Sequence, residues 1–165
     1  MPAESSFDIV SDFDRQELVN AVDQTRRETR TRYDLKDSHT EITLGERELT
    51  ITTTSELHLD AVRDILQTKA LRRGLSLKIF AFEAPREVGG ARIQQVIALR
   101  RGISDELAKK LQKLIKEHHP RVQVRIQGDA LRVASKSKDE LQAVIRTLRE
   151  RQDEFPVPLQ FTNYR

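Results

Sequence analysis

The chain has 165 residues, of which 37% are hydrophobic and 33% charged, so it has enough apolar material for a core and too many charges for a membrane protein. It contains no cysteine, which excludes disulfides, thiolate nucleophiles, iron–sulfur clusters and cysteine-ligated zinc. No apolar stretch is long enough to span a bilayer, and the acidic N-terminus lacks the basic start of a signal peptide. We therefore expect a soluble, cytoplasmic protein.

Charge is distributed unevenly along the chain. Residues 1–90 carry 13 Lys and Arg against 17 Asp and Glu, a net charge of −4, whereas residues 91–165 carry 16 against 9, a net charge of +7. A basic half is typical of a surface that meets a nucleotide or a nucleic acid, although a solvated surface of mixed charge is the more common explanation.

The first half of the chain predicts the order strand, helix, strand, strand, helix, strand. Asp14 is a good N-cap for the first helix, with Glu17 three residues later. Gly45 lies between two alternating segments and predicts a hairpin turn. The expected elements are a strand over 7–10, a helix over 15–32, strands over 42–44 and 49–51, a helix over 57–73 and a strand over 75–82.

The second half repeats this order. Residues 84–91, which include Pro85, Gly89 and Gly90, interrupt both periodicities and separate the halves. Ser104 and Ser137 are expected N-caps of the two helices that follow. The expected elements are a strand over 92–100, a helix over 105–118, strands over 122–126 and 131–133, a helix after Ser137 and a strand over 159–164.

A constant offset of 82 positions relates the halves through their apolar residues. The strands are apolar on one face only, which predicts antiparallel sheets with two helices on one side, the ferredoxin-like βαββαβ arrangement. We therefore expect an α+β fold with two ferredoxin-like domains, over 1–90 and 91–165. The matching positions are Leu49, Ile51, Leu59, Ala61, Val62 and Leu66, which fall on Leu131, Val133, Leu141, Ala143, Val144 and Leu148.

Several separated motifs run through almost the whole chain. They are Ser6–Ser11, Arg27–Lys36, Asp64–Gly74, Ala108–Lys110, Ile126–Asp129 and Gln160–Arg165. In this order they resemble the YajQ-like family of bacterial proteins. The resemblance implies that the two domains exchange their first strands, so that 7–10 pairs in the second sheet and 92–100 in the first. It also implies binding of GTP, ATP or, as in some members, cyclic di-GMP, and binding of RNA.

The linker departs from the family pattern. Gly89-Gly90-Ala91 and Arg100-Arg101-Gly102 stand where members often carry Ser-Gly-Lys and Lys-Gln-Gly. If the linker lysine contacts phosphate in relatives, that contact is missing here, and Arg100 and Arg101 could replace a later one.

Arginines are the candidates for a nucleotide site because they contact phosphate bidentately. They cluster near the end of the first helix and on the open face of the second sheet. Basic residues near a helix C-terminus also suit the macrodipole, which is a complete structural reason for them. The expected nucleotide-binding residues are Arg26, Arg30, Arg32, Lys36, Arg100, Arg125 and Arg132.

A dense basic cluster on the helix over 105–118 is the candidate for RNA binding. The strands over 122–127 and 131–135 contain no aromatic residue, so base stacking on the sheet is not expected and RNA would be bound electrostatically. A solvated helix face is the more common explanation of such lysines. The cluster consists of Lys109, Lys110, Lys113, Lys116 and Arg121.

No motif predicts catalysis, a metal site or a cofactor. The sequence has no nucleophile elbow, no phosphate-binding loop and no acidic cluster with metal spacing, and its four histidines are scattered. Three functions remain open. The first is a non-enzymatic nucleotide receptor, with arginines in the crevice between the domains, that acts through partners such as a regulatory protein. The second is a sequence-nonspecific RNA-binding protein, and the third is a protein-interaction adaptor without a nucleotide ligand.

Overall fold

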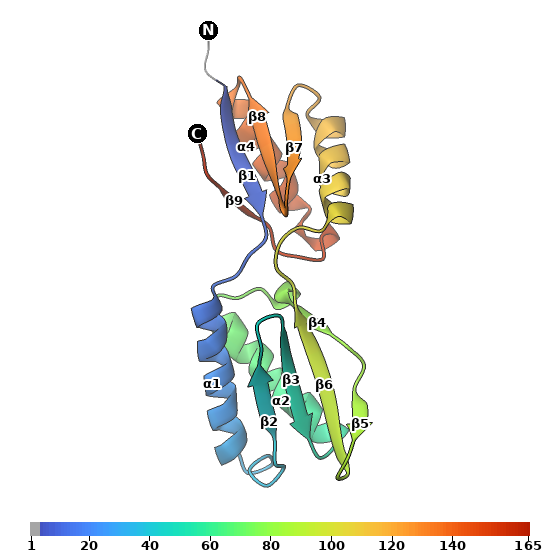
Figure 1. Cartoon of the computed structure of the whole chain (residues 1–165). Coiled ribbons are helices and arrows are strands. Elements are labelled where there is room, and N and C mark those ends of the chain that lie inside the picture. The colour runs from blue at the N-terminus through green and yellow to red at the C-terminus, as the bar shows by residue number, and fades with distance from the viewer. Residues whose placement is uncertain (1–3) are drawn as a thin grey trace. The chain divides into compact units, whose positions relative to one another are not determined.

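The computed structural model describes residues 4–165. Within them the architecture is α+β, with two antiparallel sheets and four α-helices (Figure 1). The chain divides into two compact units. Phe13–Arg100 form the central unit, and the described residues through Asp12 together with Arg101–Arg165 form the terminal unit.

The central unit packs two helices against one sheet. Strands follow the order β2-β3-β6-β4, and β5 also pairs with β6. One face of this sheet buries its apolar side chains, such as Leu49, Ile51 and Ile97, in a core shared with α1 and α2. The elements are α1 (Arg15–Thr31), β2 (Glu41–Leu44), β3 (Glu48–Thr53), α2 (Glu56–Arg72), a 3₁₀ turn (Leu77–Ile79), β4 (Phe80–Phe82), β5 (Arg86–Val88) and β6 (Arg92–Leu99).

Capping side chains explain where these helices begin and end. The Asp14 carboxylate accepts hydrogen bonds from the backbone N–H groups of Gln16 and Glu17, at 3.0 and 3.3 Å, which satisfies donors left free at a helix start. Ser55 accepts in the same way at the start of α2. Gly74 follows the end of α2 with a φ of +79°, a conformation that glycine adopts without strain.

The segment before β6 differs from the sequence expectation. A 3₁₀ turn occupies Leu77–Ile79, so the strand expected over 75–82 is confined to Phe80–Phe82. Residues 84–91, expected to break the pattern, contain β5. Both β4 and β5 pair with β6, at opposite ends of that strand. The proline between them, Pro85, has no N–H for a ladder and separates the two short strands.

The terminal unit has a four-stranded sheet in the order β7-β8-β1-β9. Its inner face packs on α3 and α4, and the fully buried Phe7 and Ile9 of β1 lie in this core. The strand expected over 159–164 ends at Thr162, before Asn163 with a φ of +55°. The elements are β1 (Ser5–Val10), α3 (Asp105–His118), β7 (Gln123–Gln127), β8 (Ala130–Ser135), α4 (Lys138–Glu150), a 3₁₀ turn (Gln152–Glu154) and β9 (Gln160–Thr162).

Strand pairing joins distant parts of the sequence in both sheets. β1 pairs antiparallel with β8 and β9, and β6 pairs antiparallel with β3 and β4. The C-terminal residue continues this pattern, since Ser6 and Arg165 exchange backbone hydrogen bonds of 3.1 and 2.9 Å. Each sheet therefore contains one strand from the other half of the sequence.

Candidate functional site

A row of polar side chains crosses the sheet face of the terminal unit that lies opposite its core. Arg125 of β7 is directly opposite Arg132 of β8, and Arg132 is directly opposite Asp8 of β1. Directly opposite residues project from the same face of a sheet. Gln123 and Gln127 flank Arg125 on the same strand face and are exposed, as is Arg125 itself.

Asp8 holds Arg132 in place within this row. The Nε of Arg132 donates to Oδ1 of Asp8 at 3.1 Å, and Nδ2 of Asn163 donates to Oδ2 at 2.8 Å. Burial of Asp8 by itself would raise the pKa of its carboxyl, but these hydrogen bonds and the charges of Arg132 and Arg165 lower that pKa below its ordinary value. Asp8 is therefore an ionised, buried anchor.

Arg125 and Arg132 lie directly opposite each other, and with the ionised Asp8 the three side chains carry a net charge of +1. Like charges directly opposite each other destabilise a sheet. Asp8 neutralises Arg132 through its Nε alone, and the two terminal nitrogens of Arg132 and the side chain of Arg125 have no recorded partner among residues 4–165. An anion bound between the two guanidinium groups would compensate the one positive charge that Asp8 leaves. We call Arg125, Arg132, Gln123 and Gln127 the sheet-face site.

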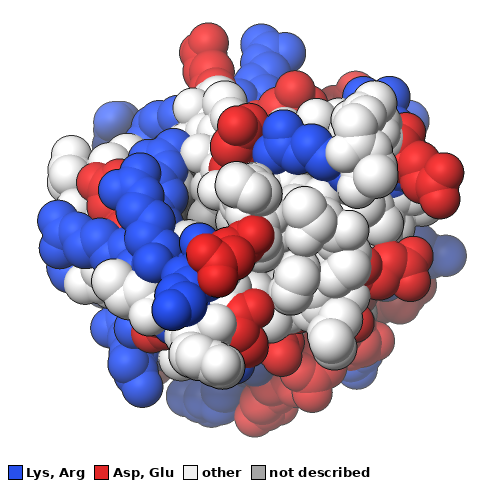
Figure 2. All heavy atoms as spheres, turned by 90° about the horizontal axis from the view of Figure 1, so that it is seen from below, with Lys and Arg blue, Asp and Glu red and all other residues white. Residues whose placement is uncertain are grey.

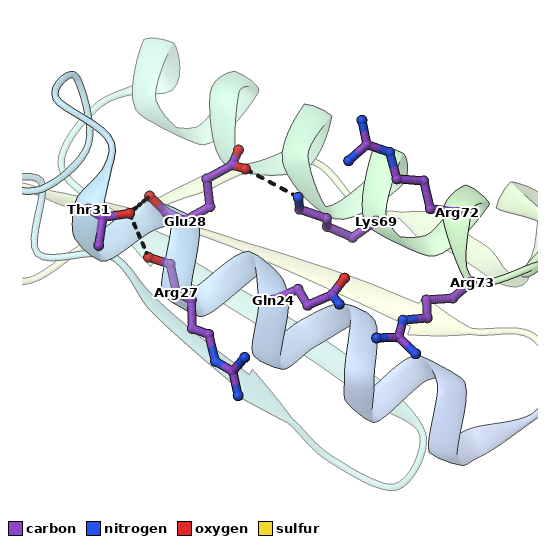
Figure 3. Close-up of a pocket in the computed structure, with 7 residues that line it drawn as sticks. All are labelled: Gln24, Arg27, Glu28, Thr31, Lys69, Arg72 and Arg73. Carbon is purple, nitrogen blue, oxygen red and sulfur yellow. Dashed lines mark hydrogen bonds and ion pairs between the residues drawn. The ribbon is translucent and has the colours of Figure 1, made fainter.

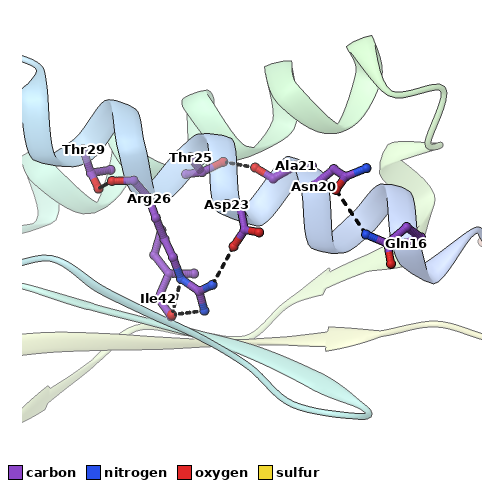
Figure 4. A network of polar contacts seen from close by, with 8 residues as sticks. All are labelled: Gln16, Asn20, Ala21, Asp23, Thr25, Arg26, Thr29 and Ile42. Carbon is purple, nitrogen blue, oxygen red and sulfur yellow. Dashed lines mark hydrogen bonds and ion pairs between the residues drawn. The ribbon is translucent and has the colours of Figure 1, made fainter.

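Arg26, which the sequence predicts at a nucleotide site, makes structural contacts instead of pointing into open solvent. Its Nε and Nη2 donate to the carbonyl of Ile42 at 3.0 and 2.7 Å, and its Nη1 pairs with Asp23 at 3.0 Å (Figure 4). These contacts fasten α1 to the edge strand β2. A role for Arg26 in nucleotide binding stays a prediction.

The other residues of the central unit that the sequence predicts to bind nucleotide differ in their contacts and exposure. Arg32 forms ion pairs with Asp34 and Glu28 at 2.8 and 3.9 Å. Lys36 lies over the ring of Tyr33, whereas Arg30 is exposed. Arg100 donates to the carbonyl of Lys78 at 3.2 Å. Five of the seven predicted residues thus belong to the central unit, and Arg125 and Arg132 to the terminal unit.

Comparison with known proteins identifies the family. Residues 5–165 match the family described as "Nucleotide-binding protein YajQ-like". The chain belongs to the YajQ-like family. Proteins named "Nucleotide-binding protein" are similar to it over the full length of both chains, with 72% identity in Roseiflexus castenholzii and 67% in Chloroflexus aurantiacus. A relative of that name in Synechococcus is 58% identical, again over both full lengths.

The basic cluster of this YajQ-like protein on α3 is exposed, as the sequence predicts. All four lysines and Arg121 are exposed. Lys109, Lys113 and Lys116 line a shallow hollow of about 390 Å³ together with Gln112 and Glu117. Lys110 lies to one side, where its Nζ donates to the carbonyl of Glu154 at 3.4 Å.

A second cationic group lies between α1 and α2. The sequence pattern draws attention to Arg27 in the arginine cluster near the end of the first helix, but not to Lys69, Arg72 or Arg73. Arg27 of α1, Lys69 and Arg72 of α2, and Arg73 directly after α2 line a groove there (Figure 3). The paired arginines at 72–73 were a signal, but only the packing of α1 on α2 brings them to one groove with Arg27. In the space-filling view from below, Lys and Arg side chains are most numerous on the left, with some Asp and Glu side chains among them (Figure 2).

Within residues 4–165 no group of three or more His, Asp or Glu side chains is placed to hold a metal ion. Of the helices described there, none has the length and apolar character needed to cross a membrane.

Proposed function

We propose that this YajQ-like protein binds a nucleotide without chemical turnover, with a phosphate group between Arg125 and Arg132. The observation that most supports this proposal is that Arg125 lies directly opposite Arg132 in the sheet, and that the buried carboxylate of Asp8 holds Arg132 in position. Arginine offers a planar fork of donors that matches phosphate. The family description and the names of the relatives support nucleotide binding, and GTP, ATP and cyclic di-GMP are the candidate ligands.

Calorimetric titration of the full chain with these three nucleotides tests the proposal. Arg125→Ala should weaken the affinity by about 1.5–3 kcal/mol, roughly 10- to 150-fold in Kd, the usual loss for a hydrogen bond to a charged group. Arg146→Ala is the matched control, because Arg146 is an exposed arginine of the same unit, on α4. If Arg125→Ala binds the nucleotide as tightly as wild type, the nucleotide binds elsewhere. If wild type binds none of the three nucleotides, the proposed function is wrong.

We also infer that the two units are duplicated βαββαβ domains with exchanged first strands, arising from residues 1–90 and 91–165. The pairing of β1 with β8 and of β6 with β3 supports this inference. The offset of 82 residues between matching apolar positions of β3 with α2 and β8 with α4 supports it as well.

Sequence-nonspecific RNA binding is a second candidate function, supported by the exposed lysines on α3. Replacing Lys109, Lys110 and Lys113 together by glutamine should weaken binding of an unstructured RNA and make log affinity depend less steeply on log salt. Nucleotide affinity should be unchanged, because these lysines are not part of the sheet-face site. If RNA affinity does not change, the lysines form a solvated helix face.

A further inference from the structure

A groove runs along the helix layer of the central unit, on elements separate from the sheet-face site. It has a volume of about 520 Å³. The lining positions on α1 follow one another at three- and four-residue spacing, as do those on α2, so each set forms one stripe along its helix. The lining residues are Gln24, Arg27, Glu28 and Thr31 of α1, Lys69 and Arg72 of α2, and Arg73, which caps the end of α2.

The charges in the groove do not cancel. The lining holds four cations and a single carboxylate. Glu28 pairs with Lys69 at 3.2 Å, which bridges the two helices, as Figure 3 shows. The lining carries a net charge of +3, or +2 when the Glu17 carboxylate that pairs with Arg73 is included, which exceeds the negative partial charges, about half a charge each, at the C-terminal ends of α1 and α2.

Two of the four cationic side chains have no ion-pair or hydrogen-bond partner among residues 4–165. Arg73 pairs with Glu17 at 3.5 Å, whereas the side chains of Arg27 and Arg72 have no recorded partner among residues 4–165. Figure 3 shows these two guanidinium groups extending from different helices and pointing away from each other, with Arg73 lying toward Gln24 between them. Long, exposed arginine side chains can swing toward a shared anion, and two forks on opposite walls suit a ligand with more than one anionic group.

We propose that this groove is a binding site for a short chain of linked phosphate groups. Arginine forks match phosphate oxygens bidentately, and the Gln24 amide adds a neutral donor. The lining contains no aromatic residue, so a base would find no stacking platform. The groove therefore recognises the phosphates alone, as inorganic tripolyphosphate or as the tail of a nucleoside triphosphate, and it does not distinguish adenine from guanine.

Calorimetry with sodium tripolyphosphate, ATP, GTP and adenosine tests the site on the full chain. Wild type should bind tripolyphosphate, should bind ATP and GTP with equal affinity at this groove, and should not bind adenosine there. The double variant Arg27→Gln/Arg72→Gln should lose at least tenfold in tripolyphosphate affinity. Arg125→Ala should keep that affinity, because its side chain lies in the other unit.

A control variant that removes the same number of positive charges distinguishes binding at this groove from general electrostatic attraction of the phosphate to the protein. Arg47 and Arg86 are exposed arginines of the central unit outside the groove, and Arg47→Gln/Arg86→Gln should leave tripolyphosphate affinity within twofold of wild type. An equal loss in both double variants, or none in Arg27→Gln/Arg72→Gln, would overturn the proposal. So would absence of tripolyphosphate binding by wild type, even if ATP bound at the sheet-face site.

A competition experiment with RNA tests whether the groove binds a short phosphate chain or the backbone of a nucleic acid. Single-stranded RNA should not displace tripolyphosphate from wild type at moderate salt. If RNA does displace it, and loses affinity in Arg27→Gln/Arg72→Gln, the groove holds a nucleic-acid backbone and the proposed occupant is wrong. Circular dichroism and thermal melting of each variant check that the fold is intact, as expected for exposed arginines without partners.

Discussion

Asp8 is a buried carboxylate in the middle of the terminal unit's sheet, and its protonation should couple pH to stability. Its folded pKa is lower than its unfolded value because Arg132 and Asn163 hydrogen-bond to the ionised form. The stabilisation is therefore complete above about pH 4, the ordinary range for aspartate, and it is lost as the pH falls through the folded pKa.

We predict that Asp8→Asn lowers the free energy of unfolding by about 1–3 kcal/mol at neutral pH, the cost of weakening charge-assisted hydrogen bonds to a buried group. Wild type should lose this extra stability as the pH falls below 4, so that the free energies of unfolding of the two proteins become similar. Urea unfolding followed by circular dichroism at pH 7, 5 and 3 measures the difference. Asp60→Asn, at an exposed aspartate of α2, is the control, and a constant difference at all pH values would contradict the prediction.

Single residues show where sequence reasoning succeeds and where it stops. The N-caps Asp14, Ser104 and Ser137 were predicted from local spacing and are confirmed by side-chain acceptors in the structure. Arg26 shows the limit, because its partner carbonyl lies 16 residues away and no local pattern reports it. The role of the sheet-face arginines in binding stays a prediction.

Edge strands receive the same protection in both sheets. The carbonyl of Ile42 on β2 accepts from Arg26 of α1, and the carbonyl of Val124 on β7 accepts from Gln112 of α3 at 3.1 Å. Positions 42 and 124 are related by the offset of 82, and the donors differ from that offset by four residues, about one helical turn. Occupied edge carbonyls cannot template pairing with another chain.

Removing the Arg26 contact should expose the edge of β2. We predict that Arg26→Met, which keeps the alkyl stem, lowers stability by about 1 kcal/mol and increases self-association of the chain. Thermal melting and size-exclusion chromatography with light scattering measure the two effects. Arg30→Met on the same helix should change stability by less than about 0.5 kcal/mol, because Arg30 is exposed. A monomeric, fully stable Arg26→Met variant would disprove the protective role.

Elements with a clear period could be predicted from the sequence, whereas short ones could not. The helix expected over 105–118 is α3 (Asp105–His118), because its apolar stripe and its Ser104 cap are local signals. β5 has three residues and pairs only through β6. β5 forms because it pairs with β6 and not because of its own composition, so no periodicity in its sequence predicts it.

The division of the chain into units makes a prediction for the whole molecule. The terminal unit combines residues through Asp12 with Arg101–Arg165, and Asp12 and Arg101 are side by side, with an ion pair of 2.6 Å. We predict that residues 4–12 joined to 101–165 by a short glycine-serine linker fold cooperatively. Residues 91–165 alone should not, because they lack Phe7 and Ile9 in the core and β1 beside β8.

Circular dichroism, thermal melting and light scattering compare the two shortened chains. The joined chain should melt cooperatively as a monomer, and residues 91–165 should aggregate through the bare edge of β8. Deletion of residues 1–11 from the full chain should likewise unfold the terminal unit while leaving the central unit folded. A soluble, cooperative 91–165 fragment would show that β1 is dispensable.

The position of β1 also sets an order of events during protein synthesis. Asp8 and Arg132 are 124 residues apart, which corresponds to roughly 6–25 s of translation at about 5–20 residues per second. During that time the central unit can fold on the ribosome, while β1 waits without its partner strands β8 and β9. Because Arg165 itself bonds to Ser6, this part of the terminal unit can close only after Arg165 has been made.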